Sequence, residues 1–467
     1  MKTERENNPK KKWIPLCERE SISPLWIFAI CANQIAINFV WAPLNVLTLP
    51  MCTKLGFSNK SSSLVMLMGS ISGLIIPPFF SAISDSTTLK MGRRRIYLIV
   101  GEIIVIIGLL MISFCREISK YFNPLSFLIA KPKEGEVFDP NSEATIYFIF
   151  GEIFALVGGN MASIPGMAMV SDVVPSSQKV LASSICSLDY AISASISNAI
   201  GAFKLYQYTS FTNESFVLFV SCIIGIIAMT VSVISTPEER LTVKPKSANP
   251  ITVLSNSVRS IDDDMLFIIF AVLFYNFGSS QFYAQGSNYI AKYIFGGIPN
   301  APDGIYDEGI SYFQFLMLVL TLSQFFFSTI NTKVINRIGF KIAWFLGCLA
   351  QATSNILLFL IPTKEFLFIP YIIAGFASCI AGSVPNAYVS LNAPSERAGE
   401  CFTLLVLTFN VSGIVTNILL QMYLGSFSFF QANSGRLVAC VSIFFIFSMH
   451  FARTGFGYNK QQKGKED

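Results

Sequence analysis

The sequence predicts an all-α protein that crosses a membrane twelve times, with its helices arranged as two pseudo-symmetric bundles of six. Of the 467 residues, 52% are hydrophobic and 13% are charged, whereas a soluble chain carries about 25% charged residues. Twelve apolar runs reach the length of about 20 residues that a spanning helix needs. A motif that recurs in the fourth and tenth runs indicates that the two bundles are copies of each other.

The apolar runs follow one another with short loops between most of them. The longest inner polar segment, 237–264, is expected to be a cytoplasmic linker between an N-terminal bundle, 24–236, and a C-terminal bundle, 265–455. Tails of 1–23 and 456–467 are expected outside the membrane. The expected spans are 24–50, 61–83, 95–115, 145–169, 179–203, 215–235, 265–294, 311–331, 341–362, 366–389, 399–424 and 435–455.

Loop charge predicts which side of the membrane each loop faces. The loop after the second run ends in Gly92-Arg93-Arg94-Arg95. With both termini cytoplasmic, most of the 33 Lys and Arg residues fall on the cytoplasmic side, as the positive-inside rule requires. The N-terminal tail has no apolar core with a cleavage site, so we expect a cytoplasmic tail rather than a signal peptide. The plasma membrane and an internal membrane both remain open.

Composition excludes several classes of function. Basic cytoplasmic loops explain the net charge of +5, so no nucleic-acid partner is expected. The ten cysteines are scattered singly and His450 is the single histidine, so we expect no metal, no cofactor beyond a co-transported proton, and no enzyme activity. We expect a monomer in a lipid bilayer. Asn59 and Asn213 begin glycosylation sequons in expected outer loops, although such triplets also arise by chance.

An internal repeat supports the division into two bundles. Ser-Ile-Pro at 163–165 is followed by Asp172, and Ser-Val-Pro at 383–385 is followed by Asn392. The loop at 337–341 is a weaker second copy of the basic loop after the second run. Duplicated halves with a binding site between them are the architecture of secondary transporters. The alternative is a coincidence between two apolar segments.

Further motifs are spread over almost the whole chain, and the basic loop is the most specific of them. In order they are Trp41-Ala42 with Leu47, Pro50 and Leu55-Gly56; Ser84-Asp85 with Lys90 and Gly92-Arg93-Arg94-Arg95; Phe295-Gly296-Gly297; Tyr306-Asp307-Glu308-Gly309; Ser383-Val384-Pro385; and Ala398-Gly399 with Leu404, Val406 and Leu407.

These motifs together resemble those of the sucrose–proton symporters of plants and their animal and fungal relatives, a glycoside–pentoside–hexuronide type of carrier within the major facilitator superfamily. The resemblance implies the major facilitator fold and transport of a sugar. The chain departs from the family where the family couples transport to protons. The positions of its fourth-helix acid and arginine are Leu156 and Met167 here, and those of its seventh-helix acids and Arg-Glu pair are Gly286, Asn288, Lys292 and Tyr293.

Acids inside the spans are candidates for proton coupling, because an ionisable group in the bilayer is costly. Asp189 lies near the middle of the fifth run, where burial favours a carboxyl group that binds and releases a proton during transport. Glu152 lies one turn from the position of the missing family acid and could replace it. Glu102 is less favoured. The alternative is that these acids pair with Lys292 or with hydroxyl groups and hold helices together.

Sugar recognition needs many neutral donors and acceptors together with an aromatic face. The seventh run is too polar to face lipid, and its glycines allow it to bend where it lines a cavity. Some of the amides are expected to be interhelical contacts instead. The candidate substrate contacts are Asn33, Gln34, Asn38, Trp41, Asn160, Gln281, Gln285, Asn288, Gln314 and Asn386.

The basic loop is expected to act as a cytoplasmic latch. Asp85 is placed to meet the start of the eleventh run near Gly399, where a helix dipole favours an anion, and Arg94 or Arg95 is placed to pair with Asp172. Such contacts would close the cytoplasmic side and break when the carrier opens inward. The alternative is an ordinary positive-inside turn. The expected latch consists of Asp85, Gly92, Arg93, Arg94, Arg95 and Asp172.

The sequence therefore predicts a secondary active transporter of a neutral sugar or glycoside, such as a sucrose-like disaccharide or a hexose, that works by alternating access with or without a proton. An uncoupled sugar facilitator is the alternative, because the family's coupling residues are missing. A transport-deficient sugar sensor is less favoured, since the tail after the last run is short.

Overall fold

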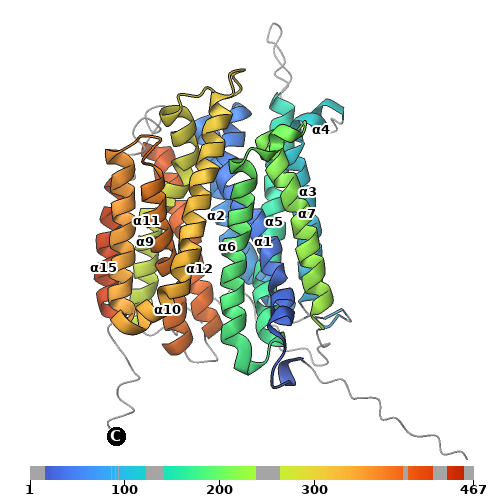
Figure 1. Cartoon of the computed structure of the whole chain (residues 1–467). Helices are drawn as coiled ribbons and strands as arrows, with labels where there is room; N and C mark the ends of the chain where they lie inside the picture. The colour runs from blue at the N-terminus through green and yellow to red at the C-terminus, as the bar shows by residue number, and fades with distance from the viewer. Residues whose placement is uncertain are drawn as a thin grey trace, which may run out of the picture.

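A computed structural model of the chain describes residues 16–85, 87–89, 91–92, 94–121, 141–237, 263–392, 398–423 and 439–456. The described residues are nearly all helical. Figure 1 shows long helices packed side by side, with α1 starting and α15 ending at the same end of the bundle. We call this end the tail end and the opposite one the far end. This confirms the predicted all-α fold class.

Each of the twelve predicted runs overlaps a helix. We call the helices from α1 to α7 the N-half. They are α1 (Pro24–Lys54), α2 (Asn59–Asp85), α3 (Arg95–Ser113), α4 (Cys115–Tyr121), α5 (Asn141–Val173), α6 (Lys179–Ala202) and α7 (Asn213–Ser235), with short 3-10 turns at Leu16–Glu18, Ser176–Gln178 and Leu205–Tyr208.

The helices from α9 to α15 form the C-half. In α10 the backbone of Gly339 has φ 80° and ψ 162°, a conformation that glycine adopts readily, so this long helix is two helices joined by a sharp bend. These correspond to the predicted runs 311–331 and 341–362. The elements are α9 (Asp263–Asn288), a π-helix (Tyr289–Ile294), α10 (Ile305–Leu360), α11 (Phe368–Asn392), α12 (Ala398–Tyr423) and α15 (Ile443–Gly455).

Among the described residues, eight helices are long and apolar enough to cross a membrane, and three apolar helices are shorter: Met265–Ser280, Leu404–Ile418 and Ala439–Gly455. Helix α6 is not among these, because it carries several serines together with Asp189 and Asn198. A helix this polar is stable inside a membrane when its polar side faces other helices. Consistent with this, α6 packs against α1 on one side and α10 on the other.

The N-half packs around α1, which contacts α5, α6 and α7. Helices α3 and α5 approach each other closely at paired glycines, where the carbonyl of Gly158 lies near Gly101 and that of Gly151 lies near Gly108. Small residues at such crossings let two backbones approach and gain van der Waals contact, which drives helix association in lipid.

Part of the expected N-terminal tail is attached to the N-half. The backbone N–H of Ile22 donates to the Gln178 side chain at 2.8 Å, and the Gln178 amide donates back to the Ile22 carbonyl at 3.0 Å. Leu16 and Ile22 are buried in the apolar cluster at the tail end of this half. Ser23 then caps α1 by accepting from the N–H of Trp26.

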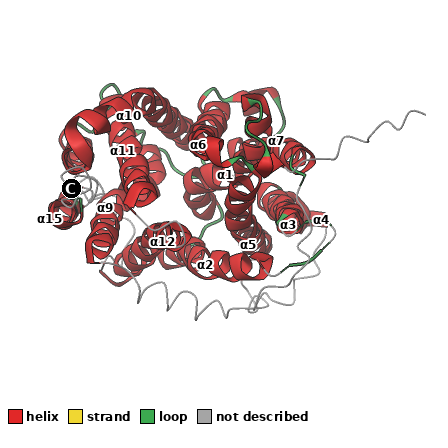
Figure 2. Cartoon of the chain, turned by 90° about the horizontal axis from the view of Figure 1, so that it is seen from below, coloured by secondary structure: helices red, strands yellow, loops and turns green. Residues whose placement is uncertain are grey.

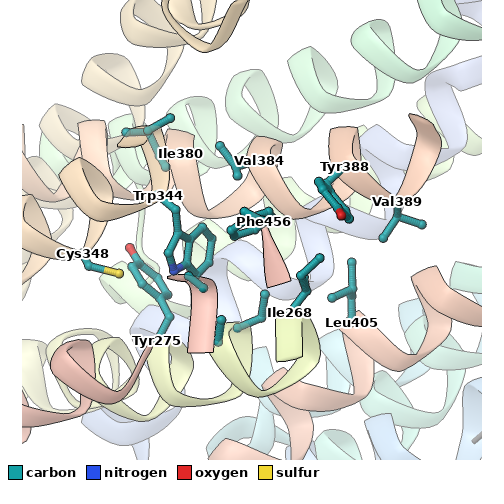
Figure 3. Packing of buried hydrophobic residues seen from close by; sticks show 14 of the residues in the cluster. Ile268, Tyr275, Trp344, Cys348, Ile380, Val384, Tyr388, Val389, Leu405 and Phe456 are labelled. Carbon is teal, nitrogen blue, oxygen red and sulfur yellow. The ribbon is translucent and has the colours of Figure 1, made fainter. Parts of the chain in front are cut away.

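The C-half has an aromatic core built by α9, α10, α11 and α15. Figure 3 shows Tyr275 and Trp344 next to each other in this core, with Ile380 and Val384 of α11 nearby. The Trp344 indole N–H donates to the hydroxyl of Ser448 at 3.1 Å, so the buried ring has a partner for its polar atom.

The two halves meet along two pairs of helices. Figure 2, viewed from the tail end, shows α6 beside α10 and α2 beside α12. An apolar cluster shared by both halves contains Val46 and Leu47 of α1, Ile200 of α6 and Tyr306 of α10. These residues lie in the part of each helix that is nearer the far end, so the shared core lies on that side.

Candidate functional site

A cluster of charged side chains joins the halves at the far end. The Lys54 ammonium lies 2.6 Å from Glu214 Oε1 and also pairs with Asp307. Lys54 is the last residue of α1, whereas Glu214 and Asp307 lie in the first turns of α7 and α10. Glu214 is in the same half as Lys54, whereas Asp307 belongs to the other half. The acids are placed in the first turns of their helices, where the helix dipole favours negative charge.

Neutral side chains extend this contact between the halves. The Asn288 side chain, fully buried at the end of α9, donates to Thr53 of α1 at 2.9 Å and accepts from the Tyr306 hydroxyl at 2.5 Å. The Lys54 carbonyl accepts from Asn300 at 2.8 Å. Asn288 was expected to contact substrate. In the structure, its side chain joins α1 to α10.

Gln314 takes part in a similar contact between α7 and α10. Its Oε1 accepts from Asn213 at 2.8 Å, and its side chain lies against Gly201 of α6. Asn213 also donates to Ser311 at 3.3 Å and is 2% exposed. The asparagine of the second sequon is therefore buried in a contact between the halves, in contrast to the expected position in an outer loop.

We expect Asn213 to carry no glycan, because a glycan would replace one of the two amide hydrogens that its nitrogen donates to Ser311 and Gln314 and could not be buried. In glycosylating cells, an Asn59→Gln variant should keep the same gel mobility after deglycosidase treatment. A mobility shift that persists in this variant and disappears in Asn59→Gln/Asn213→Gln would contradict the prediction. The side chain of Asn59 itself lies outside the described residues.

Asp189 is an isolated acid among the described residues of the N-half. Its residue is 0% exposed, and neither carboxyl oxygen has a hydrogen-bond partner among the described residues. Cys31 Sγ of α1 lies 3.8 Å from the Ala182 carbonyl of α6, and Asn38 and Asp189 lie equally far along these two parallel helices. Asn38 is also buried, and it makes no hydrogen bond to another described residue.

The other two intramembrane acids are held differently. Glu152 of α5 is 2% exposed and accepts a hydrogen bond from Thr48 of α1 at 2.7 Å. Glu102 of α3 is buried with its Oε1 against Gly225 of α7. Within the described part of the chain, no lysine or arginine forms an ion pair with either one. Of the alternative in which the acids pair with Lys292 or with hydroxyl groups, only the hydroxyl contact of Glu152 with Thr48 is observed among these residues. The three acids thus occupy three separate helix contacts.

Three further predicted substrate contacts, Asn33, Trp41 and Asn160, lie at contacts within the N-half. Asn33 donates to the Ser232 hydroxyl of α7 at 3.1 Å and accepts from Gln34 at 2.6 Å. The ring of Trp41 lies against Gly159 of α5. Asn160 of α5 donates to the Ser72 hydroxyl of α2 at 3.1 Å.

In the C-half, the side chains of the predicted contacts Gln281 and Gln285 lie outside the described residues. Asn386 is exposed on α11 and donates to the Gly382 carbonyl at 2.7 Å. Close by in sequence, Tyr283 of α9 and Ser378 of α11 share a hydrogen bond at 2.7 Å. Asn386 is thus the one C-half candidate whose described side chain is exposed, since Asn288 and Gln314 are buried.

The predicted latch is described in part. The Arg94 Nε lies 3.3 Å from Asp172 Oδ2, and the Arg94 guanidinium donates to Ser84 at 2.7 Å. Arg95 instead donates to the Val233 carbonyl. These partners all belong to the N-half. Gly92 has φ 103°, which favours glycine at this turn. The side chains of Asp85 and Arg93 lie outside the described residues, so the latch remains a prediction.

Sequence reasoning missed the charged cluster at the far end. Lys54, Glu214 and Asp307 each lie at a helix end, where charges are common and usually solvated. The available signal was the Tyr306-Asp307-Glu308-Gly309 motif, which places an acid at the start of a helix. In the described residues, no group of three or more His, Cys, Asp or Glu side chains is placed to hold a metal ion.

Comparisons with known proteins agree on the fold. The sequence profile described as Major Facilitator Superfamily matches residues 26–417. The chain is 28% identical over 179 residues to the sucrose transport protein SUC3 of Arabidopsis thaliana, which is 38% of this chain but only 29% of that relative. It is 21% identical over 469 residues to SUC4 of the same plant, covering 92% and 89%. A solved variant of the nucleoside transporter NupG has a TM-score of 0.62 at 13% identity, covering 92% and 99%.

Proposed function

Because the chain belongs to the Major Facilitator Superfamily, we propose that it transports a neutral sugar or glycoside, such as a sucrose-like disaccharide or a hexose, by alternating access. The chain is a multi-pass membrane transporter and not an enzyme. The observation that carries the sugar class is the similarity to a plant sucrose transport protein over 92% of the chain.

Polar and aromatic side chains of α1, α5 and α11 support a neutral substrate. Asn38, Asn160 and Asn386 offer amide donors and acceptors, and Trp41 offers an aromatic face. Sugar hydroxyl groups need partners of this kind, and the C–H face of a sugar ring packs on an aromatic ring. These four residues, with Gln281 and Gln285, are the substrate contacts that we propose.

The distribution of contacts between the halves supports alternating access. Where both partners are described, the hydrogen bonds and ion pairs between the halves lie between the middle of the bundle and the far end, as with Ser195–Thr321 at 2.9 Å and Asn288–Thr53. This is the arrangement of a carrier closed at one end. If the tail end lies in the cytoplasm, as loop charge indicates, such a carrier would face inward in this state.

Proton coupling through Asp189 is part of the proposal. A fully buried carboxyl group without a partner is costly when charged, so Asp189 would carry a proton in this state and release it in another. Glu152 is the second candidate. An uncoupled facilitator is favoured by one observation, since Leu156 and Met167 occupy the positions of the family's acid and arginine.

The sugar assignment is tested by counterflow. Purified protein in liposomes preloaded with unlabelled sugars should take up the labelled form of at least one sugar in a panel of disaccharides and hexoses, at two pH values. Empty liposomes and a panel of nucleosides serve as controls. Exchange of none of the sugars, with protein that is folded and correctly inserted, would reject the carbohydrate class.

A further inference from the structure

Lys54, in the ion cluster at the far end, takes its partners from both halves. Lys54 is shared by Glu214, which moves with it in the N-half, and by Asp307, which belongs to the C-half. The Lys54 carbonyl shows the same arrangement, since Arg116 of the N-half donates to it at 3.0 Å and Asn300 of the C-half at 2.8 Å. Both polar ends of Lys54 thus have one partner in each half.

The three side chains also differ in burial, and the C-half acid is the most exposed of them. Exposure of the side chain is 11% for Lys54 and 3% for Glu214, but 41% for Asp307. Water can therefore hydrate Asp307 when the halves separate, whereas Lys54 and Glu214 are largely removed from water. Separating a buried pair leaves an uncompensated charge, which is strongly unfavourable.

We propose that these three residues form an asymmetric ion gate, in which Lys54 and Glu214 stay together and Asp307 is the partner that leaves when the far end opens. The gate rests on the proposed alternating access. Glu214 neutralises Lys54 in both states, so opening breaks only the contact to the hydrated acid. The gate thereby sets the ratio of the closed to the open far end without leaving a buried charge unpaired.

The gate predicts opposite effects for its two acids. Asp307→Asn weakens a contact that exists only in the closed state, so the open population should rise by about tenfold, which is the change that a hydrogen bond to a charged group typically supports. Glu214→Gln leaves Lys54 dependent on Asp307. Opening would then leave the ammonium without an ion-pair partner, so the open population should fall.

Distances between spin labels test this prediction. The labels are placed at two exposed far-end positions, Tyr208→Cys in the N-half, 88% exposed, and Ile298→Cys in the C-half, 67% exposed. Cys17, Cys401 and Cys440 are replaced by Ser so that they do not take up the label. We expect a longer label distance to gain population in Asp307→Asn and to lose it in Glu214→Gln. Shifts of the same sign, or no shift in Asp307→Asn, would overturn the gate.

Two further variants make the result specific. Glu308 also faces the other half, 3.8 Å from Lys204, but the Lys204 and Glu308 side chains are 34% and 57% exposed. Neither end of this pair is buried, and such pairs contribute little. Glu308→Gln should therefore leave the distances unchanged. Asn300→Gly removes the C-half donor to Lys54 without changing a charge, and glycine suits the φ of 61° at this position. It should open the far end as Asp307→Asn does, and a wild-type distribution would contradict the gate.

The two proposals fail separately. If counterflow succeeds and the distances do not respond to Asp307→Asn, the gate is wrong and the carrier stands. If no sugar is exchanged and the two acids still shift the distances in opposite directions, the gate stands and the sugar class is wrong.

Discussion

An Asp189→Asn variant is expected to keep sugar counterflow close to the wild-type rate while losing uptake driven by a proton gradient. Asparagine keeps the shape and polarity of the side chain but cannot bind and release a proton in the pH range of transport. Counterflow exchanges one sugar for another and needs no net proton movement. Uphill uptake does need it, because the gradient enters the cycle only through a group that is protonated on one side and deprotonated on the other.

The measurement is labelled sugar uptake into liposomes at several imposed pH differences. Wild-type uptake should increase as the outside becomes more acidic than the inside, and uptake by Asp189→Asn should not depend on this difference. Glu102→Gln is the matched control, since Glu102 is also a buried intramembrane acid but lies against Gly225 between α3 and α7. It should behave as the wild type does.

Two outcomes would redirect the assignment. If Glu152→Gln abolishes the pH response and Asp189→Asn does not, coupling belongs to the acid that accepts from Thr48. If the wild type itself shows no response to the pH difference, the protein is an uncoupled facilitator, and Asp189 is a buried carboxyl group without a role in coupling.

The fold could be predicted from the sequence because hydrophobic length and loop charge are local properties. A run such as 95–115 needs no partner to be recognised, and it corresponds to α3. The bend that separates the eighth and ninth runs was also visible, since the polar segment around Gly339 interrupts two apolar stretches. A membrane requires helices with satisfied backbones, so little else had to be known.

The site could be predicted only in part, because an amide in a helix gives no local indication of what it faces. Asn288 and Gln314 carry amide groups of the kind that bind sugar hydroxyls, yet they join the halves at the far end. Asn33 joins α1 to α7. These roles depend on which helices become neighbours. The isolation of Asp189 was one of two possibilities that the sequence left open, since an acid in the middle of a span can also find a partner on another helix.

The charged cluster could not be predicted for the same reason. Lys54, Glu214 and Asp307 belong to three helices that are far apart in the sequence, and each one alone is an ordinary charge at a helix end. Only the approach of α1, α7 and α10 turns them into a shared contact. The role of a charged residue in a membrane protein thus depends on its tertiary neighbours, whereas the length of an apolar run predicts a spanning helix without them.

The close crossing of α3 and α5 leads to the largest expected effect on stability. A Cβ atom added at Gly108 would lie 2.4 Å from the backbone nitrogen of Ala155 and 2.6 Å from the carbonyl oxygen of Gly151. Backbone atoms of a packed helix cannot turn aside as a long side chain can, so Gly108→Ala must push the helices apart. Overpacking of this kind typically costs about 1–3 kcal/mol.

We therefore expect Gly108→Ala to lower the melting temperature of the purified protein and its yield from membranes. Gly382→Ala is the matched control, since it adds the same methyl group to a helical glycine that has no neighbouring atom within 4 Å. It should be neutral or slightly stabilising, because alanine favours a helix over glycine. Equal melting temperatures for the two variants would show that α3 and α5 can separate without loss, and that their close approach is not what holds the N-half together.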